Sequence, residues 1–129
     1  MCKPSNRLWV IGLLMVFPPL IVQAASVGDT ETGVAAYYGK VFQGRHTASG
    51  EPYDGEAYTA AHNRLPFGTR LRVTNLDNGK RVELTINDRG PTTPGRIIDV
   101  SRRAASDLGF LRQGLTNVQL EVIGLPEGR

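Results

Sequence analysis

Residues 81–91 constrain the fold of this chain more than any other stretch. Apolar residues at every second position from 82 to 86 alternate with polar ones, the period-two pattern of a β-strand with one buried face. The pattern stops at Asp88, and Gly90-Pro91 prevents the strand from continuing. Two interpretations of Asp88 follow. It binds backbone amides within a turn, or a rigid strand end presents its carboxylate to a ligand.

Residues 1–24 have the composition of a secretory signal peptide. Two cations and no anion precede the 15 residues 8–22, which are apolar apart from Gly12 and Pro18-Pro19. An uncleaved membrane anchor is the weaker alternative, because a span needs roughly 20 apolar residues without a proline pair. Val22-Gln23-Ala24 predicts cleavage after Ala24. The single cysteine, Cys2, leaves with the leader, so we expect a mature chain without thiols or disulfides.

Charge argues against some classes of partner. The full chain has 15 basic and 12 acidic residues, and loss of Lys3 and Arg7 with the leader leaves 13 against 12. The mature chain has no basic block longer than a pair such as Arg102-Arg103. We therefore expect neither nucleic acid nor a membrane surface as a partner.

The mature chain is predicted to be one small domain. Its length fits a single domain. We expect a flexible lead-in at residues 25–32, a folded domain at 33–124 and a short tail at 125–129.

Short β segments separated by Gly, Pro, Asn and Asp are predicted along the domain. They are expected at residues 34–38, 56–61, 70–76, 81–88, 97–100 and 116–123. A helix is expected at 102–108, with Ser101 as its N-cap and Gly109 as its stop. Asp77-Asn78-Gly79 predicts a tight hairpin with two positive-φ positions. The fold class predicted is mainly all-β, a small six-stranded closed barrel with one or two short helices.

A long loop at residues 40–55 joins the first two segments. It is rich in polar residues and glycine, and a loop of this length in a small domain is more often functional than spare. Its candidates for substrate contact are Thr47, Ser49, Glu51 and Tyr53.

Several blocks together resemble the rare lipoprotein A family. In chain order they are Tyr37-Tyr38-Gly39, Thr47-Ala48-Ser49-Gly50-Glu51, Thr59-Ala60-Ala61-His62, Leu65-Pro66-Phe67-Gly68-Thr69, Val73-Thr74-Asn75, Asn87-Asp88-Arg89-Gly90-Pro91 and Arg96-Ile97-Ile98-Asp99-Val100-Ser101. The resemblance implies a double-psi β-barrel, the fold of the first expansin domain. It also implies a lytic transglycosylase that cuts peptidoglycan glycan strands, preferring strands without stem peptides. The lipobox cysteine of that family is absent at Ala25, which favours an unanchored periplasmic or secreted protein.

The resemblance further implies that Asp88 and Glu51 form the acidic pair of the active site and that His62 lines the same cleft. This suits the chemistry, because glycosidic cleavage needs one group that protonates the leaving oxygen and another that steadies the oxocarbenium-like charge. The alternatives are a solvated loop acid at Glu51 and a satisfied, partly buried histidine at His62.

Weaker candidates for substrate contact are Tyr37, Tyr38, Tyr53 and Arg89. The tyrosines would stack on sugar rings, although aromatics on strands are more often core. Arg89 would pair with Asp88 or bind a substrate carboxylate. We interpret Asp99 as a buried hydrogen-bonding residue of the fold.

No cofactor is expected, and no metal, since His46 and His62 lie 16 residues apart and match no ligand spacing. We expect a monomer that acts on peptidoglycan. The open alternative is a non-catalytic glycan-binding or wall-loosening protein of the expansin kind, which shares the barrel and a similar acidic site.

Export without lipidation is the first testable prediction. Because Ala25 stands where a lipidated precursor has Cys, protein recovered from the cell envelope is expected to begin near Ala25 and to carry no lipid. Intact-mass spectrometry checks this. A diacylglycerol adduct, or retention of residues 8–22, would contradict it.

Overall fold

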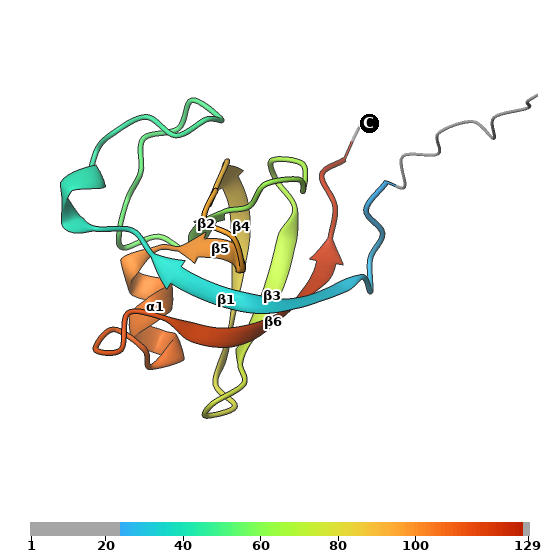
Figure 1. The fold of residues 1–129 in the computed structure, drawn as a ribbon. Coiled ribbons are helices and arrows are strands. Elements are labelled where there is room, and N and C mark those ends of the chain that lie inside the picture. The colour runs from blue at the N-terminus through green and yellow to red at the C-terminus, as the bar shows by residue number, and fades with distance from the viewer. Residues whose placement is uncertain (1–23, 128–129) are drawn as a thin grey trace, which may run out of the picture.

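A computed structural model describes residues 24–127. The expected signal peptide up to residue 23 lies outside the described residues. The described chain contains six strands, one α-helix and a single 3-10 turn (Figure 1). In chain order they are β1 (Thr30–Tyr37), η1 (Lys40–Phe42), β2 (Thr59–Ala61), β3 (Arg70–Asn75), β4 (Arg81–Asp88), β5 (Arg96–Val100), α1 (Arg102–Leu108) and β6 (Thr116–Gly124).

The strands close into a barrel in the order β1-β5-β2-β4-β3-β6. The pairs β1–β5 and β2–β4 are parallel, whereas the other neighbours are antiparallel. Helix α1 and the loop after β1 lie on the same side of the barrel in Figure 1, and the N–H of Arg103 in α1 donates to Gly55 O of that loop. The prediction of a small, mainly β barrel is confirmed.

Side chains along β4 alternate between the core and the solvent, as the sequence predicts. Val82, Leu84 and Ile86 are buried, whereas Arg81 and Glu83 are exposed. The buried residues belong to one core to which every strand and α1 contribute. Phe110, which follows the helix, is fully buried and meets the ring of Tyr37 edge-on at 5.7 Å between ring centroids.

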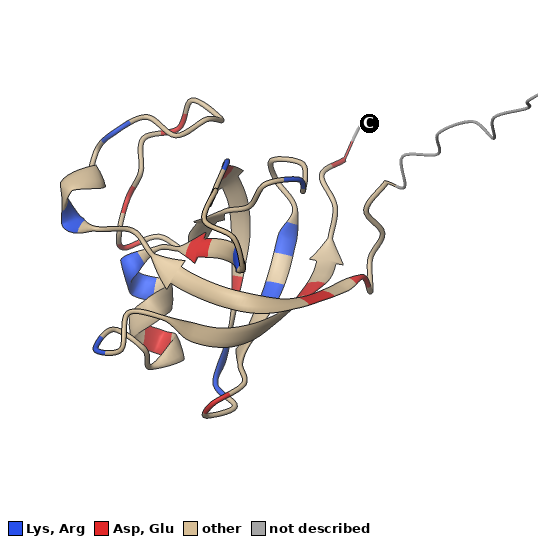
Figure 2. Cartoon of the chain, viewed as in Figure 1, with Lys and Arg blue, Asp and Glu red and all other residues tan. Residues whose placement is uncertain are grey.

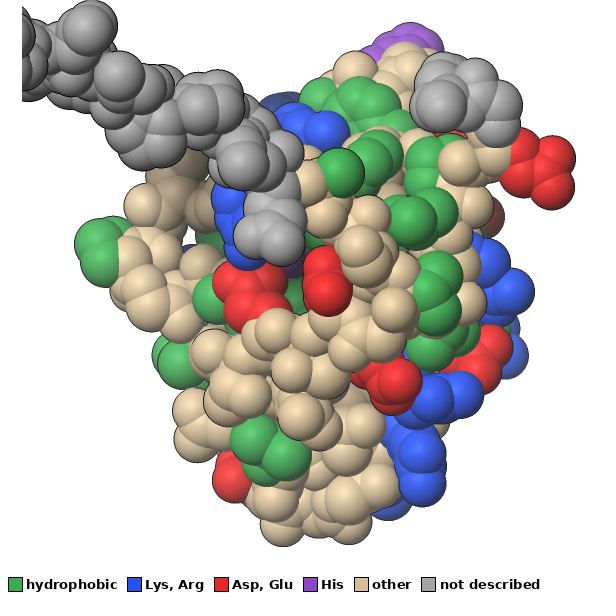
Figure 3. All heavy atoms as spheres, turned by 90° about the vertical axis from the view of Figure 1, so that its right-hand side faces the viewer, with side chains coloured by type: hydrophobic (Ala, Val, Ile, Leu, Met, Phe, Trp, Pro, Cys, Tyr) green, Lys and Arg blue, Asp and Glu red, His purple; other side chains and the backbone are tan. Residues whose placement is uncertain are grey.

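Charged side chains of both signs are interspersed over the barrel (Figure 2). On the outer face Arg72 lies between two acids, with Nη2 3.5 Å from Glu83 and Nη1 3.2 Å from Glu121. Acidic and basic groups also adjoin one another in the space-filling view (Figure 3). Exposed pairs of this kind contribute at most about 1 kcal/mol each.

Strand β1 begins at residue 30, four residues before the predicted start. Residues 30–32 were expected to be a flexible lead-in, but they pair with Glu121, Leu120 and Gln119 of β6. The prediction failed because ladder pairing uses backbone groups and so needs no apolar side-chain pattern. Two further backbone bonds, Gly28 N–H to Val122 O and Val122 N–H to Asp29 O, extend this ladder.

The hairpin between β3 and β4 also differs from prediction. Gly79 has φ of 79°, but no non-glycine residue described has positive φ, so Asn78 does not adopt the expected conformation. A five-residue connection, residues 76–80, forms instead, in which the N–H of Asn75 donates to Lys80 O and that of Gly79 to Asn75 O. Asn75 favours it because its buried side chain donates to Leu108 O at the end of α1.

None of the helices in the described part of the chain has the length and hydropathy required to cross a bilayer.

Ser101 caps α1 as predicted. Its Oγ accepts the N–H of Ala104 and donates to Ala57 O, and Gly109 ends the helix at φ 80°. Replacement of Ser101 by Ala is expected to lower the free energy of unfolding by about 1–2 kcal/mol, since a cap and a buried acceptor both lose a partner. Urea denaturation measures this. Ser106→Ala, on the exposed face of the same helix, is the control and should stay within about 0.5 kcal/mol of the unaltered protein; equal losses in both variants would refute the capping role.

Candidate active site

The end of β4 is irregular, and this irregularity aims Asp88. Ala60 of β2 pairs with Ile86, but Ala61 pairs with Asp88, so the register skips Asn87. In an uninterrupted strand Asp88 would point to the same side as the buried Ile86. An extra residue re-aims the side chains beyond it. Asp88 therefore lies on the same side of the sheet as Ala61, opposite to the core residues Ala60 and Ile86, although Ala61 is itself only 2% exposed.

Three donors hold the Asp88 carboxylate. Oδ1 accepts the N–H of Ala48 at 2.8 Å and its neighbour Arg89 N–H at 2.9 Å, and Oδ2 accepts the Tyr38 hydroxyl at 2.6 Å. The turn interpretation of Asp88 was thus partly right, because two of these donors are backbone amides. The third donor, and one of the amides, come from distant parts of the chain, and together they fix the direction of the carboxylate.

Tyr38 remains a hydrogen-bond donor to Asp88. Burial raises the pKa of its phenol, and the hydrogen bond to Asp88 and the negative charge of Asp88 raise the pKa further. Its ring stacks on Tyr53 with centroids 4.3 Å apart, and the Tyr53 hydroxyl accepts the N–H of Arg102. The hydroxyl of Tyr38 is therefore held by Asp88, and its ring is held by Tyr53.

The turn at residues 47–51 is bound directly to the end of β4. Besides the Ala48 bond, Ser49 N–H donates to Asn87 O at 3.2 Å, and Asn87 Nδ2 donates to Glu51 Oε1 at 3.1 Å. The structure thus brings Glu51 and Asp88 to the same end of the barrel, with Asn87 as the link. Glu51 is exposed, whereas Asp88 is half-buried. Sequence reasoning missed Asn87, although it stands next to Asp88 in the quoted block.

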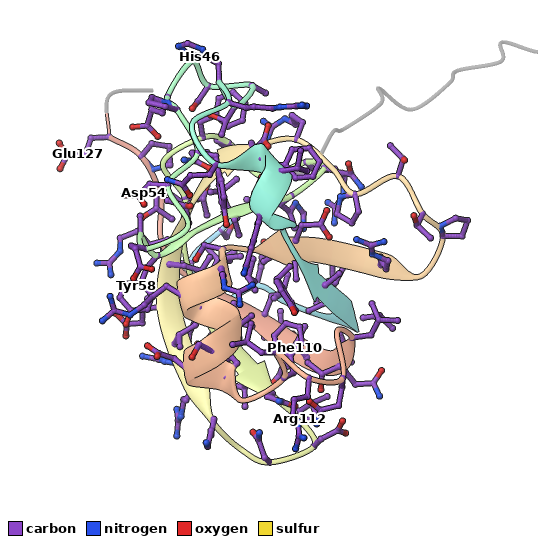
Figure 4. All side chains as sticks on the ribbon, turned by 90° about the vertical axis from the view of Figure 1, so that its left-hand side faces the viewer. His46, Asp54, Tyr58, Phe110, Arg112 and Glu127 are labelled. Atoms are coloured by element: carbon purple, nitrogen blue, oxygen red, sulfur yellow. The ribbon has the colours of Figure 1, made fainter. Side chains whose placement is uncertain are left out.

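Thr47 and Ser49 shape this turn. The Thr47 hydroxyl donates to Glu51 O at 2.7 Å and lies 2.9 Å from the Ser49 hydroxyl. Thr47 is only 8% exposed. Both residues were predicted to contact substrate, but their hydroxyls are engaged within the turn. Figure 4 shows His46 at the outer end of this loop.

His62 faces Glu31 and not the Asp88 carboxylate. Its Nε2 lies 2.8 Å from Glu31 Oε1, and its Nδ1 accepts the N–H groups of Arg64 and Leu65. Nε2 therefore carries the proton of a neutral ring, which is 2% exposed. Only backbone groups of His62 reach the site, where its N–H donates to Asp88 O. The expectation that the His62 ring lines the cleft is not met, and the satisfied, buried histidine describes it better.

Burial lowers the pKa of His62, while the hydrogen bond to Glu31 and the Glu31 charge oppose that change. Protonation of Nδ1 would also break the two hydrogen bonds it accepts from backbone amides. The folded protein therefore disfavours the imidazolium form.

Within residues 24–127, the Arg89 guanidinium forms no ion pair with the Asp88 carboxylate. Its Nη1 donates to His62 O at 3.1 Å, and its guanidinium lies over the Phe67 ring, 4.1 Å from the centroid. The side chain is exposed and stays a candidate for binding a substrate carboxylate.

Two predicted sugar-stacking tyrosines have interior partners instead. Tyr53 is 4% exposed beneath Tyr38, and Tyr37 packs on Phe110 and donates its hydroxyl to Leu111 O. The accessible aromatic nearby is Phe42, 41% exposed and edge-on to Tyr38. Its position next to Tyr38 is what makes Phe42 a candidate for contact with a sugar, and no motif in the sequence indicates that position.

Asp99 lies closer to the site than predicted. It is half-buried, with its Oδ1 2.7 Å from Arg96 Nη2, and it pairs with Ala61, the same residue that pairs with Asp88 on the other side. No group of three or more potential metal ligands occurs within the described residues.

Comparison with known proteins agrees with this architecture. Residues 30–120 match the family model described as lytic transglycolase. The chain belongs to the rare lipoprotein A (RlpA) family.

RlpA proteins of several bacteria are similar to this chain. A probable endolytic peptidoglycan transglycosylase RlpA of Synechocystis is 50% identical over 100 residues, covering 78% of this chain and 31% of that protein. The endolytic peptidoglycan transglycosylase RlpA of Neisseria meningitidis is 53% identical over 94 residues, covering 73% and 39%. The chain thus spans about a third of the length of the curated relatives it matches.

Solved structures place this RlpA domain among double-psi β-barrels. Streptomyces papain inhibitor superposes with a TM-score of 0.62 at 22% identity, covering 76% of this chain and 97% of that protein. Clavibacter michiganensis expansin gives 0.60 at 23% identity, covering 78% and 53%. At these identities the likeness concerns the fold alone, and it confirms the predicted fold class.

The buried histidine of this RlpA domain predicts a pH dependence. With a folded pKa below the unfolded value of about 6.5, the unfolded chain binds more protons than the folded chain as pH falls through this range. Stability is therefore present above about pH 6.5 and is lost as pH falls toward the folded pKa. In His62→Gln the free energy of unfolding should change less between about pH 7.5 and 5.5.

Denaturant unfolding at several pH values measures this slope. His46→Gln, which alters an exposed histidine, is the matched control and should keep the slope of the unaltered protein. The same slope in all three proteins would show that His62 does not titrate in this way.

Proposed function

We propose that this domain is an endolytic peptidoglycan lytic transglycosylase. It cleaves the bond between N-acetylmuramic acid and N-acetylglucosamine, on peptide-poor glycan strands, and leaves 1,6-anhydromuramic ends. Membership of the family, together with the names of relatives such as the Neisseria protein, supports the reaction class. The observation that carries the proposal is the pair of carboxylates, Asp88 and Glu51, held at one barrel end through Asn87.

The reaction needs one proton removed and one proton delivered. The 6-hydroxyl of muramic acid attacks its own anomeric carbon, the C1–O6 bond forms, and the bond from C1 to the leaving oxygen breaks. Asp88 accepts three hydrogen bonds in the free protein, an arrangement suited to a base, and takes the 6-hydroxyl proton. Glu51 delivers a proton to the leaving oxygen, so the protons balance and no water is consumed.

Tyr38 and the turn at 47–51 keep Asp88 in one orientation. Tyr38 donates at any physiological pH because burial raises its pKa. A base held in one direction loses less entropy on the way to the transition state. Arg89, exposed beside the site, would contact the lactyl carboxylate of muramic acid.

The place of action follows from the substrate. Peptidoglycan lies outside the cytoplasm, so the proposal agrees with the expected signal peptide and a periplasmic or secreted protein. We expect the domain to act as a monomer.

Asp88→Asn tests the mechanism. The amide keeps the size and much of the hydrogen bonding of the carboxylate but cannot take the 6-hydroxyl proton. Release of anhydromuramic products from naked glycan strands is expected to fall by about 10²-fold or more, the scale of general acid–base catalysis. Glu51→Gln should behave alike, and strand binding should persist in both. Asp107→Asn, on the exposed side of α1, is the control.

Mass analysis of products formed in water enriched in oxygen-18 provides the readout. Full activity of Asp88→Asn would refute the assignment of Asp88. Solvent oxygen at the new reducing end would indicate a hydrolase. Binding of glycan without any product would favour the expansin-like, wall-loosening alternative.

A further inference from the structure

The 3-10 turn η1 exposes two neighbouring apolar side chains beside the acidic site. Val41 is 66% exposed and Phe42 is 41% exposed, and none of the residues of η1 is buried. These side chains therefore contribute little to the core of the barrel. Apolar side chains that gather in the open next to polar groups are typical of a surface that contacts a ligand.

Tyr38 joins Phe42 to the carboxylate of Asp88. The rings of Tyr38 and Phe42 meet edge-on with their centroids 5.9 Å apart, and the Tyr38 hydroxyl donates to Asp88 Oδ2 at 2.6 Å. A single side chain thus separates the Phe42 ring from the proposed base. A polymer bound at Asp88 therefore has its neighbouring sugars within reach of Phe42.

Backbone hydrogen bonds hold the segment from Phe42 to Arg45 in place. The N–H of Arg45 donates to Phe42 O at 3.0 Å, and Arg45 O accepts the N–H of Tyr53 at 2.7 Å. Because the buried Tyr53 stacks on Tyr38, this segment is tied to the pair of rings that orders the acidic site. A surface that is ordered before binding loses less entropy when a ligand arrives.

Arg45 adds a positive charge to this surface. Its guanidinium lies 5.5 Å from the centroid of the Phe42 ring, and its side chain is exposed. Among the side chains that the structure describes, no carboxylate forms an ion pair with it. A guanidinium with free donors binds a carboxylate through two parallel hydrogen bonds. Phe42 and Arg45 together therefore suit a sugar that carries a carboxylate.

We propose that Phe42 and Arg45 form a subsite for a second muramic acid of the bound strand, away from the bond that is cleaved. The Phe42 ring packs against the sugar, and Arg45 binds the lactyl carboxylate. An attached stem peptide converts that carboxylate into a neutral amide, so this subsite selects strands without peptides. Arg89 over the Phe67 ring is a similar pair directly after Asp88, for the muramic acid at the cleaved bond. The identity of the glycan rests on the proposed function.

Neutralising the lactyl groups tests the role of Arg45. Naked glycan strands are compared by titration calorimetry with the same strands after conversion of their carboxylates to methylamides, in an Asp88→Asn background that prevents turnover. Arg45→Gln should bind naked strands about tenfold more weakly and amidated strands as the background protein does. Arg112→Gln is the control, an exposed arginine at the opposite end of the molecule from His46 (Figure 4). Equal losses for both kinds of strand in Arg45→Gln would overturn the carboxylate contact.

The contact of the ring is tested separately. Phe42→Leu keeps an apolar side chain without a flat ring, so it should bind naked and amidated strands about fivefold more weakly. Phe42→Tyr keeps the ring and should bind like the background protein. Tyr58→Leu, which removes a ring with 38% exposure elsewhere on the surface, is the control. Unchanged affinity in Phe42→Leu would refute the contact.

Turnover separates this subsite from the catalytic groups. With Asp88 intact, Arg45→Gln should raise KM for naked strands about tenfold and keep kcat within about threefold, because a remote subsite binds substrate and transition state alike. A lower kcat at an unchanged KM would contradict the proposal. If strands bind through Phe42 and Arg45 but the unaltered protein releases no anhydromuramic product, the transglycosylase function fails while the subsite stands. Product release with an unchanged KM in Arg45→Gln would have the opposite meaning.

Discussion

The slip of register at the end of β4 is the constraint on which the candidate site depends. Up to Ile86 the strand alternates, with apolar residues toward the core. A carboxylate at position 88 in strict alternation would point inward, where an unpaired charge costs several kcal/mol. Skipping Asn87 in the pairing with β2 turns Asp88 outward and, at the same step, frees the Asn87 side chain to bind Glu51. One irregularity therefore helps to position both carboxylates of the proposed acidic pair.

The loop between η1 and β2 is ordered by the same strand end. A connection of this length costs considerable conformational entropy when fixed. Hydrogen bonds between residues 48, 49 and 51 of the loop and residues 87 and 88 of β4 offset part of that cost. Within the turn, Gly50 has φ of 96°, which a residue with a side chain rarely adopts, and Thr47 closes it by bonding to Glu51 O. The block Thr47-Ala48-Ser49-Gly50-Glu51 is thus a local unit whose geometry delivers one acid to the other.

Local signals in the sequence predicted most of the fold. Alternation located β3, β4 and β6 to within a residue, and Ser101 and Gly109 bounded α1. The start of β1 and the hairpin at Gly79 were missed because they depend on pairing partners, on β6 and on the Asn75 side chain. For the site, the motif blocks located Asp88 and Glu51 near each other. They could not tell where the rings of His62 and Tyr53 point, since that is decided by Glu31 and Arg102, both remote in sequence.

The neighbours of Asp99 also depend on contacts that the sequence alone does not show. In the sequence, Asp99 follows two isoleucines and precedes a helix cap, so a buried structural acid was the natural interpretation. Because side chains alternate along a strand, Asp99 already points to the opposite side of β5 from Ile98 and Val100, which are both fully buried. Alternation along β5 does not show which residue of the next strand pairs with Asp99. That pairing depends on the closed barrel, in which β2 lies between β5 and β4. Ala60 and Ala61 then face opposite sides of β2. Ala60 lies in the core and pairs with Val100 and Ile86, whereas Ala61, itself only 2% exposed, pairs with Asp99 and Asp88. A strand of only three residues is therefore enough to bring Asp99 of β5 and Asp88 of β4 onto the same side of the sheet, because one residue of β2 pairs with both.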